Sequence, residues 1–155
     1  MSGMIAQYAL YLIGLVLITA MLFELRSGKI PNWLTLVPFV VFIAVAVTVE
    51  DRSALLWQLM LAVAVFAVGL LLFAFVGFGA GAVKLMSGLA LFVPVSEALT
   101  ATAVFVASVF LTGFVVIQAR KFIGNEESNW HVLRGKSTPM SVPLAMAGLG
   151  SFFVF

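Results

Sequence analysis

The chain contains no cysteine and few charged residues, and both absences narrow the kinds of protein it can be. Without cysteine it can hold neither a disulfide nor a Cys-based zinc site. Only 9% of its residues are charged, whereas a soluble domain has about 25%. The composition is instead 64% hydrophobic, and the apolar residues come in long runs. The sequence therefore predicts an integral membrane protein.

Basic residues are missing from the first 23 positions, which hold no Lys or Arg. A secretory signal peptide begins with a positive segment, so this pattern predicts a retained first helix whose N-terminus faces outward. The basic residues further along are few and adjoin apolar runs, so no nucleic-acid surface is expected. The single histidine, His131, has no Cys or carboxylate cluster beside it, so no metal site is expected.

Six apolar runs predict an all-α polytopic membrane protein with about six transmembrane helices. A helix needs about 20 residues to cross the hydrocarbon core, so the fourth and sixth runs are expected to borrow flanking residues. There is no internal repeat, and a single domain over residues 1–155 is expected. The runs span residues 5–23, 34–49, 54–76, 85–95, 99–117 and 142–155.

Basic residues concentrate in alternate connections between these runs. Connections 24–33, 77–84 and 118–140 hold seven of the eight Lys and Arg residues. The remaining one, Arg52, lies on the other side with three acidic residues, Glu50, Asp51 and Glu97. Cytoplasmic loops of membrane proteins are enriched in Lys and Arg, so this split places those three connections in the cytoplasm and both termini outside.

Three of the cytoplasmic segments have compositions that could carry chemistry. Residues 24–33 read Glu-Leu-Arg-Ser-Gly-Lys-Ile-Pro-Asn-Trp, in which Pro31 turns the chain and Asn32 is expected to cap the next helix. Residues 77–85 read Gly-Phe-Gly-Ala-Gly-Ala-Val-Lys-Leu, where three glycines weaken a helix. Residues 137–143 read Ser-Thr-Pro-Met-Ser-Val-Pro and suit a helix start.

Each segment also has an explanation without chemistry. These are an ordinary turn between two helices, a small-residue packing patch through Gly77 and Gly81, and a proline-shaped helix start. The glycine-rich segment is not a phosphate-binding loop, because the Gly-Lys-Ser/Thr ending is missing.

Taken together, these segments resemble the prepilin peptidases, a family of membrane aspartic proteases. The likeness is closest to the short single-domain members that serve Tad/Flp pili. Those proteins carry Asp-x-Arg and then Ile-Pro-Asn after the first helix, where residues 24–26 here are Glu-Leu-Arg and residues 30–32 are Ile-Pro-Asn. They carry Gly-x-Gly-Asp-x-Lys-Leu before the fourth helix, where residues 79–85 are Gly-Ala-Gly-Ala-Val-Lys-Leu. Residues 139–141, Pro-Met-Ser, weakly match a Pro-aromatic-Gly motif of the family.

The resemblance implies a substrate, a location and a set of site residues. The substrate would be a type IV or Flp prepilin precursor, cleaved at the cytoplasmic face of a bacterial inner membrane, with pilus-assembly proteins as further partners and no cofactor. The two catalytic aspartates would fall at positions 24 and 82, which are expected to approach each other through a bend at Gly79 and Gly81. Supporting motif residues would be Arg26, Ile30, Pro31, Asn32, Gly79, Gly81 and Lys84. The cysteine-rich methyltransferase-associated domain of the larger members is expected to be absent.

The chain departs from the family at both catalytic positions, where it has Glu24 and Ala82. Aspartic proteolysis needs two carboxylates that share a proton, and alanine supplies none. Glutamate moves its carboxylate by about 1 Å, a displacement that can cost about 100-fold in rate. The only aspartate, Asp51, is expected outside, and Glu126 and Glu127 lie in a different loop. We therefore expect little or no peptidase activity.

Two explanations of these departures stay open. Position 82 could carry a substitution that silences an enzyme, or the chain could be a natural pseudo-peptidase that binds prepilin or assists pilus assembly without cleaving. An unrelated small transporter or structural subunit is a weaker alternative, because transporters usually show repeat symmetry and broken midplane helices. Arg26, Lys29 and Lys84 are expected to orient the protein in the membrane rather than to catalyse.

Overall fold

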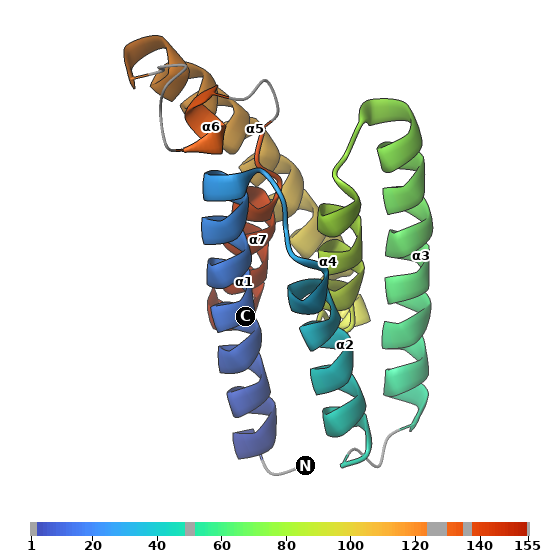
Figure 1. Cartoon of the computed structure of the whole chain (residues 1–155). Helices are drawn as coiled ribbons and strands as arrows, with labels where there is room; N and C mark the ends of the chain where they lie inside the picture. Colours follow the sequence, from blue (N-terminus) through green and yellow to red (C-terminus); the bar gives the residue numbers. More distant parts are fainter. Residues whose placement is uncertain (1–2, 49–51, 124–129, 135–137, 155) are drawn as a thin grey trace.

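The computed structural model describes residues 3–48, 52–123, 130–134 and 138–154, and their regular secondary structure is helical throughout (Figure 1). The all-α prediction is therefore confirmed for these residues. The long helices are α1 (Gly3–Ser27), α3 (Arg52–Val76) and α5 (Ala98–Ile123), and each is long and apolar enough to cross a membrane. The shorter apolar helices are α2 (Asn32–Ala46), α4 (Ala80–Ala90) and α7 (Ser141–Val154). A 3₁₀ turn, η1 (Val95–Glu97), and a one-turn helix, α6 (His131–Arg134), complete the chain.

Two of the long helices end in the same way, at a glycine in the left-handed conformation. Gly28 follows α1 with φ of 72°, and Gly77 follows α3 with φ of 77°. The Gly28 N–H bonds to the Glu24 carbonyl at 2.8 Å, and the Phe78 N–H bonds to the Leu72 carbonyl at 3.3 Å. Left-handed backbone of this kind strongly favours glycine, so these two residues set where the helices stop.

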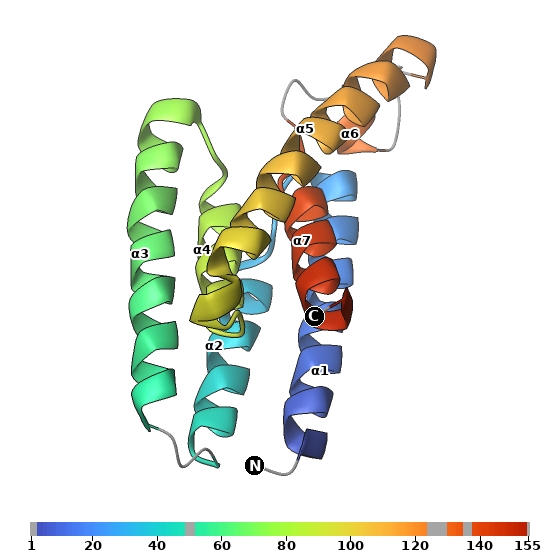
Figure 2. The same cartoon turned by 180° about the vertical axis from the view of Figure 1, so that it is seen from behind.

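The helices form one bundle in which α4 packs on α2 and α3, while α7 packs on α1 and α5. Helix α5 crosses the back of this bundle obliquely (Figure 2). One end of the bundle, which we call the α6 end, carries α6 and the turns at 28–31 and 77–79, whereas the start of α1, the end of α2 and the start of α3 lie at the opposite end (Figure 1). Both turns run back along the bundle, so α2 and α4 begin below the ends of α1 and α3 (Figure 1).

The core lies mainly between α1, α2, α4 and α7. Its buried apolar side chains include Ile13, Leu17, Leu34, Leu85 and Leu144. By contrast, α3 and α5 expose apolar side chains on most of their surface, and only 11% and 17% of their most apolar windows are buried. An apolar surface of this extent belongs in lipid, so the chain is an integral membrane protein.

Several helix boundaries differ from those predicted. Helix α1 continues through Glu24 and Arg26 to Ser27, because the stop is Gly28 rather than the end of the apolar run. Helix α4 begins and ends five residues earlier than expected, because Gly79 (φ −66°, ψ 133°) is its extended N-cap and Gly81 is tolerated inside it. Helix α5 continues to Ile123 and so includes Arg120 and Lys121, which favour the negative end of the helix dipole.

Some predictions are not tested by the described residues. That six helices span the membrane and that both termini face outward remain predictions. Asp51, Glu126 and Glu127 lie outside the described residues. The sequence did not predict α6.

Candidate functional site

Glu24 lies in the last turn of α1 and is half-buried. Its Oε2 accepts a hydrogen bond of 2.6 Å from the backbone N–H of Ser141, the first residue of α7. The first N–H groups of a helix have no partner within the helix and carry partial positive charge, so a carboxylate is a favourable partner for them. The bond joins the first and last helices across 117 positions of the chain.

The start of α7 is a buried, proline-flanked segment. Ser141 is fully buried, and its Oγ has no hydrogen-bond partner within the described part of the chain. Pro143 has no N–H to satisfy, which suits the first turn of a helix. The predicted helix start is confirmed at Ser141. Its contact with Glu24 was not predicted, because no local pattern marks so distant a pairing.

Ala82 lies in the first turn of α4 and is only 1% exposed. It belongs to a cluster of buried apolar residues that also contains Ala20 and Leu144. Ala20 precedes Glu24 by one helical turn, and Leu144 follows Ser141 by about one turn. The helices that carry Glu24 and Ser141 therefore pack into the same core as position 82, where the chain offers a methyl group and no ionisable atom.

Asn32 and Lys84 join the two predicted motifs directly. The Lys84 Nζ donates a hydrogen bond to Asn32 Oδ1 at 3.1 Å. The expectation that Asn32 caps its helix was wrong: Pro31 occupies the N-cap, no side chain caps the helix, and Asn32 is its first residue. Lys84 therefore makes a specific hydrogen bond in addition to carrying a positive charge. The bond connects the start of α2 to the start of α4.

The three glycines of residues 77–81 have different roles. Gly77 alone of the three has positive φ, Gly79 is the extended N-cap of α4, and Gly81 lies inside that helix, so the chain bends at Gly77 and Gly79 rather than at Gly81. A Cβ at Gly81 would lie 3.0 Å from Ile30 Cβ and 3.3 Å from the Ile30 carbonyl oxygen, whereas one at Gly77 or Gly79 would meet nothing within 4 Å. The packing explanation therefore applies to Gly81, which lets residue 30 lie against α4.

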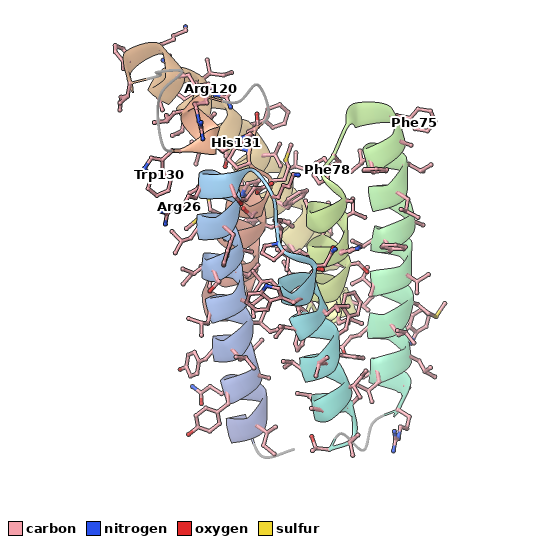
Figure 3. The ribbon with its side chains drawn as sticks, in the orientation of Figure 1. Arg26, Phe75, Phe78, Arg120, Trp130 and His131 are labelled. Atoms are coloured by element: carbon pink, nitrogen blue, oxygen red, sulfur yellow. The ribbon has the colours of Figure 1, made fainter. Side chains whose placement is uncertain are left out.

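Helix α6 closes this end of the bundle. The His131 ring lies so close to Gly28 that a Cβ there would overlap it. Arg120 Nε donates to the Val132 carbonyl at 2.8 Å, which fixes α6 to α5. Figure 3 shows Arg120, His131 and Trp130 gathered here, with Arg26 at the nearby end of α1. Sequence reasoning treated His131 as a loop residue and missed this contact, because four residues give too little periodicity to predict a helix.

The turn before α4 has one buried and one exposed phenylalanine. Phe78 is 8% exposed and packs in the core with Ala82, whereas Phe75 is 83% exposed at the end of α3 (Figure 3). The buried ring anchors the turn that leads into α4.

The site has one carboxylate where aspartic proteolysis needs two. Among the described residues the acidic side chains are Glu24 and Glu97, and Glu97 lies in η1, between the end of α4 and the start of α5. The arrangement can hold a single acid beside a helix N-terminus. It cannot form a proton-sharing dyad from the described residues.

Comparison with known families gives one match. The sequence model of the type IV leader peptidase family matches residues 11–117, which include positions 24 and 82 and run from α1 into α5. No curated protein matches the chain, and no solved structure does. The matched region covers well over half of the chain.

Proposed function

The chain belongs to the type IV leader peptidase family, and from this premise we propose that it recognises a type IV or Flp prepilin precursor at the α6 end. With alanine at position 82 it cleaves that precursor little or not at all. The loss of cleavage is inferred from Ala82. This residue is 1% exposed and lies in the core cluster on which the Glu24 helix also packs.

The α6 end faces the cytoplasm of a bacterial inner membrane in this proposal. Six helices then cross the membrane and both termini face outward. The support is the charge distribution: Arg26, Lys29 and Arg134 belong to the α6 end, whereas Arg52 begins α3 at the other end. Because the chain has no cysteine, single cysteines introduced at Ser27 and Ser53 would report the side of each end through labelling by an impermeant maleimide.

Positions 24 and 82 flank the scissile bond in this proposal. The Glu24 carboxylate would accept a proton from the attacking water, and a second acid at position 82 would donate to the carbonyl oxygen. The Ser141 N–H would hold the Glu24 carboxylate in place through their 2.6 Å bond. Without the second acid the peptide carbonyl is not protonated, so binding is retained and cleavage is lost.

A natural pseudo-peptidase is the second candidate. The observation that favours it is the same bond, because it gives Glu24 a structural partner that needs no catalysis. A carboxylate at position 24 would then be retained to connect α1 with α7 after proteolysis had been lost.

A cleavage assay in liposomes with a prepilin tests the proposal. The chain would be compared with A82D, with E24D/A82D, and with A145D as a control that places the same carboxyl at another buried alanine of the same core cluster. Cleavage by A82D alone would identify Ala82 as the lesion and Glu24 as a competent partner.

The other outcomes separate the two candidates. Cleavage only by E24D/A82D would show that both positions have diverged. Prepilin binding without cleavage by any variant would favour the pseudo-peptidase. A chain that neither binds nor cleaves prepilin in any form would overturn the proposal.

A further inference from the structure

An apolar groove of about 440 Å³ lies between α3, α4, α5 and α7. Its lining side chains are apolar except for Thr102, and none is charged. The Thr102 hydroxyl donates a hydrogen bond of 2.7 Å to the Ala98 carbonyl of its own helix, so it needs no partner from a ligand. The lining therefore suits hydrocarbon, which makes no hydrogen bonds.

The groove has a buried floor and an exposed rim. Leu89 on α4 and Ala147 on α7 belong to the floor and are buried. Ala64 on α3 and Thr102 on α5 belong to the rim and are exposed. Because α3 and α5 expose apolar side chains on most of their surface, the opening between them faces the lipid that surrounds these helices.

The groove is long and narrow. On α3 its lining runs from Leu61 to Leu72, a length of about 16 Å along the helix axis. The volume spread over this length gives a mean width of about 6 Å. A helix with its side chains is about 10–12 Å across and does not fit. Apolar carbon atoms pack about 3.5–4.0 Å apart, so a single hydrocarbon chain does fit.

The groove also lies at the depth of one bilayer leaflet. Helix α3 is about 37 Å long, and the hydrocarbon core that it crosses is about 30 Å thick. Leu72 lies about 6 Å from the end of α3 at the α6 end, so with α3 centred in the core it is just inside the hydrocarbon. One leaflet supplies about 15 Å of that core, so the groove extends from there to the bilayer midplane.

We propose that the groove binds one acyl chain of a membrane phospholipid from the leaflet at the α6 end. The headgroup lies near the level of Leu72, and the chain runs toward Leu61. Lipid elsewhere covers only the outward faces of the helices, whereas this chain reaches buried residues of α4 and α7. The inference does not depend on the proposed function.

The bound chain connects two pairs of helices. Within the described residues α3 packs chiefly on α4, and α5 packs chiefly on α7. All four helices line the groove, so a chain seated there contacts both pairs at once. Met86, Leu89 and Leu144 line the groove and also belong to, or pack on, the cluster that contains Ala82. The lipid therefore supports the packing of the core around position 82.

Photocrosslinking in nanodiscs tests where the acyl chain lies. The probe is a phosphatidylcholine that carries a diazirine midway along one acyl chain, diluted in unlabelled lipid. We expect crosslinks to the groove floor, at Leu89 and Ala147, as well as to the outward faces of α3 and α5. Lipid that merely surrounds the protein does not reach the floor, so crosslinks confined to the outward faces would overturn the inference.

Filling the groove should displace the lipid. A64F and A101F each place a ring in the groove, from α3 and from α5. A67F and A107F make the same change at exposed alanines of the same helices that do not line it. In native mass spectrometry we expect a bound phospholipid on the unsubstituted chain, on A67F and on A107F, and roughly tenfold weaker binding of it to A64F and A101F.

Three results of this experiment would overturn the inference. The first is equal retention of phospholipid by all four variants, and the second is a bound mass that corresponds to a free fatty acid. The third is a lipid-free dimer that A64F and A101F dissociate, which would assign the groove to a second copy of the chain. Crosslinking uses the unsubstituted chain, so it stays decisive if a variant fails to fold. Neither experiment measures prepilin binding or cleavage, so the proposed function is tested separately.

Discussion

The Glu24 carboxylate and the Ser141 backbone N–H are joined by a hydrogen bond of 2.6 Å that links the end of α1 to the start of α7. Position 24 therefore has a structural role in this chain whether or not it has a catalytic one. Activity measurements on Glu24 variants alone would not separate the structural role from the catalytic one. Stability measurements separate them.

Removing the carboxylate should destabilise the fold. E24A leaves the Ser141 N–H without its partner, and the loss of a hydrogen bond to a charged group costs about 1.5–3 kcal/mol. E24Q keeps a neutral acceptor of the same length and should lose less. Thermal unfolding in detergent would measure both, with E97A in η1 as the control. Equal losses for E24A and E97A would show that the bond to Ser141 contributes nothing specific.

Two glycines with positive φ should respond differently to alanine. Gly77 has open space around it, so G77A should cost only the left-handed strain of about 1–2 kcal/mol. G28A should cost more, because its new Cβ also overlaps the His131 ring. Denaturant unfolding in detergent would compare the two variants.

The His131 contribution can be isolated. In an H131A background G28A should lose its excess cost and behave as G77A does. If G28A costs the same with and without His131, α6 does not pack on the end of α1 as described.

The bond between Lys84 and Asn32 should appear as a coupling energy. K84M and N32A each remove one partner, and the double variant should be less destabilised than the sum of the two. Because both side chains are exposed, we expect a coupling of about 0.5 kcal/mol. A double-mutant cycle on unfolding free energies measures it. Strict additivity would mean that the two motifs are not connected by this bond.

The sequence predicted the helices well because lipid imposes a simple rule. Each spanning segment must be apolar and must satisfy its own backbone, so apolar runs indicate helices. The motif order also led to positions 24 and 82, which lie on helices that share one core. The C-terminal ends of α1 and α3 could have been predicted from Gly28 and Gly77, whose left-handed φ ends each helix.

Contacts between distant segments could not be predicted in this way. The bond from Glu24 to Ser141 depends on how α1 and α7 pack, and no local sequence pattern in either helix indicates it. Asn32 was expected to cap its helix, but its side chain instead accepts a hydrogen bond from Lys84 on another helix. Gly81 was expected to bend the chain. Instead, its lack of a side chain lets Ile30 pack against α4.

Helices α2 and α4 begin deeper in the bundle than the ends of α1 and α3, and this affects the surrounding bilayer. Helix α4 has 11 residues, about 16 Å, whereas its neighbour α3 has 25, about 37 Å. A hydrocarbon core is about 30 Å thick, so α4 is subject to hydrophobic mismatch. The non-helical segments 28–31 and 77–79 also need hydrogen-bond partners at that depth. We therefore expect lipid headgroups and water to enter a local depression at this end, so that water reaches the end of α1, where Glu24 lies, without crossing lipid tails.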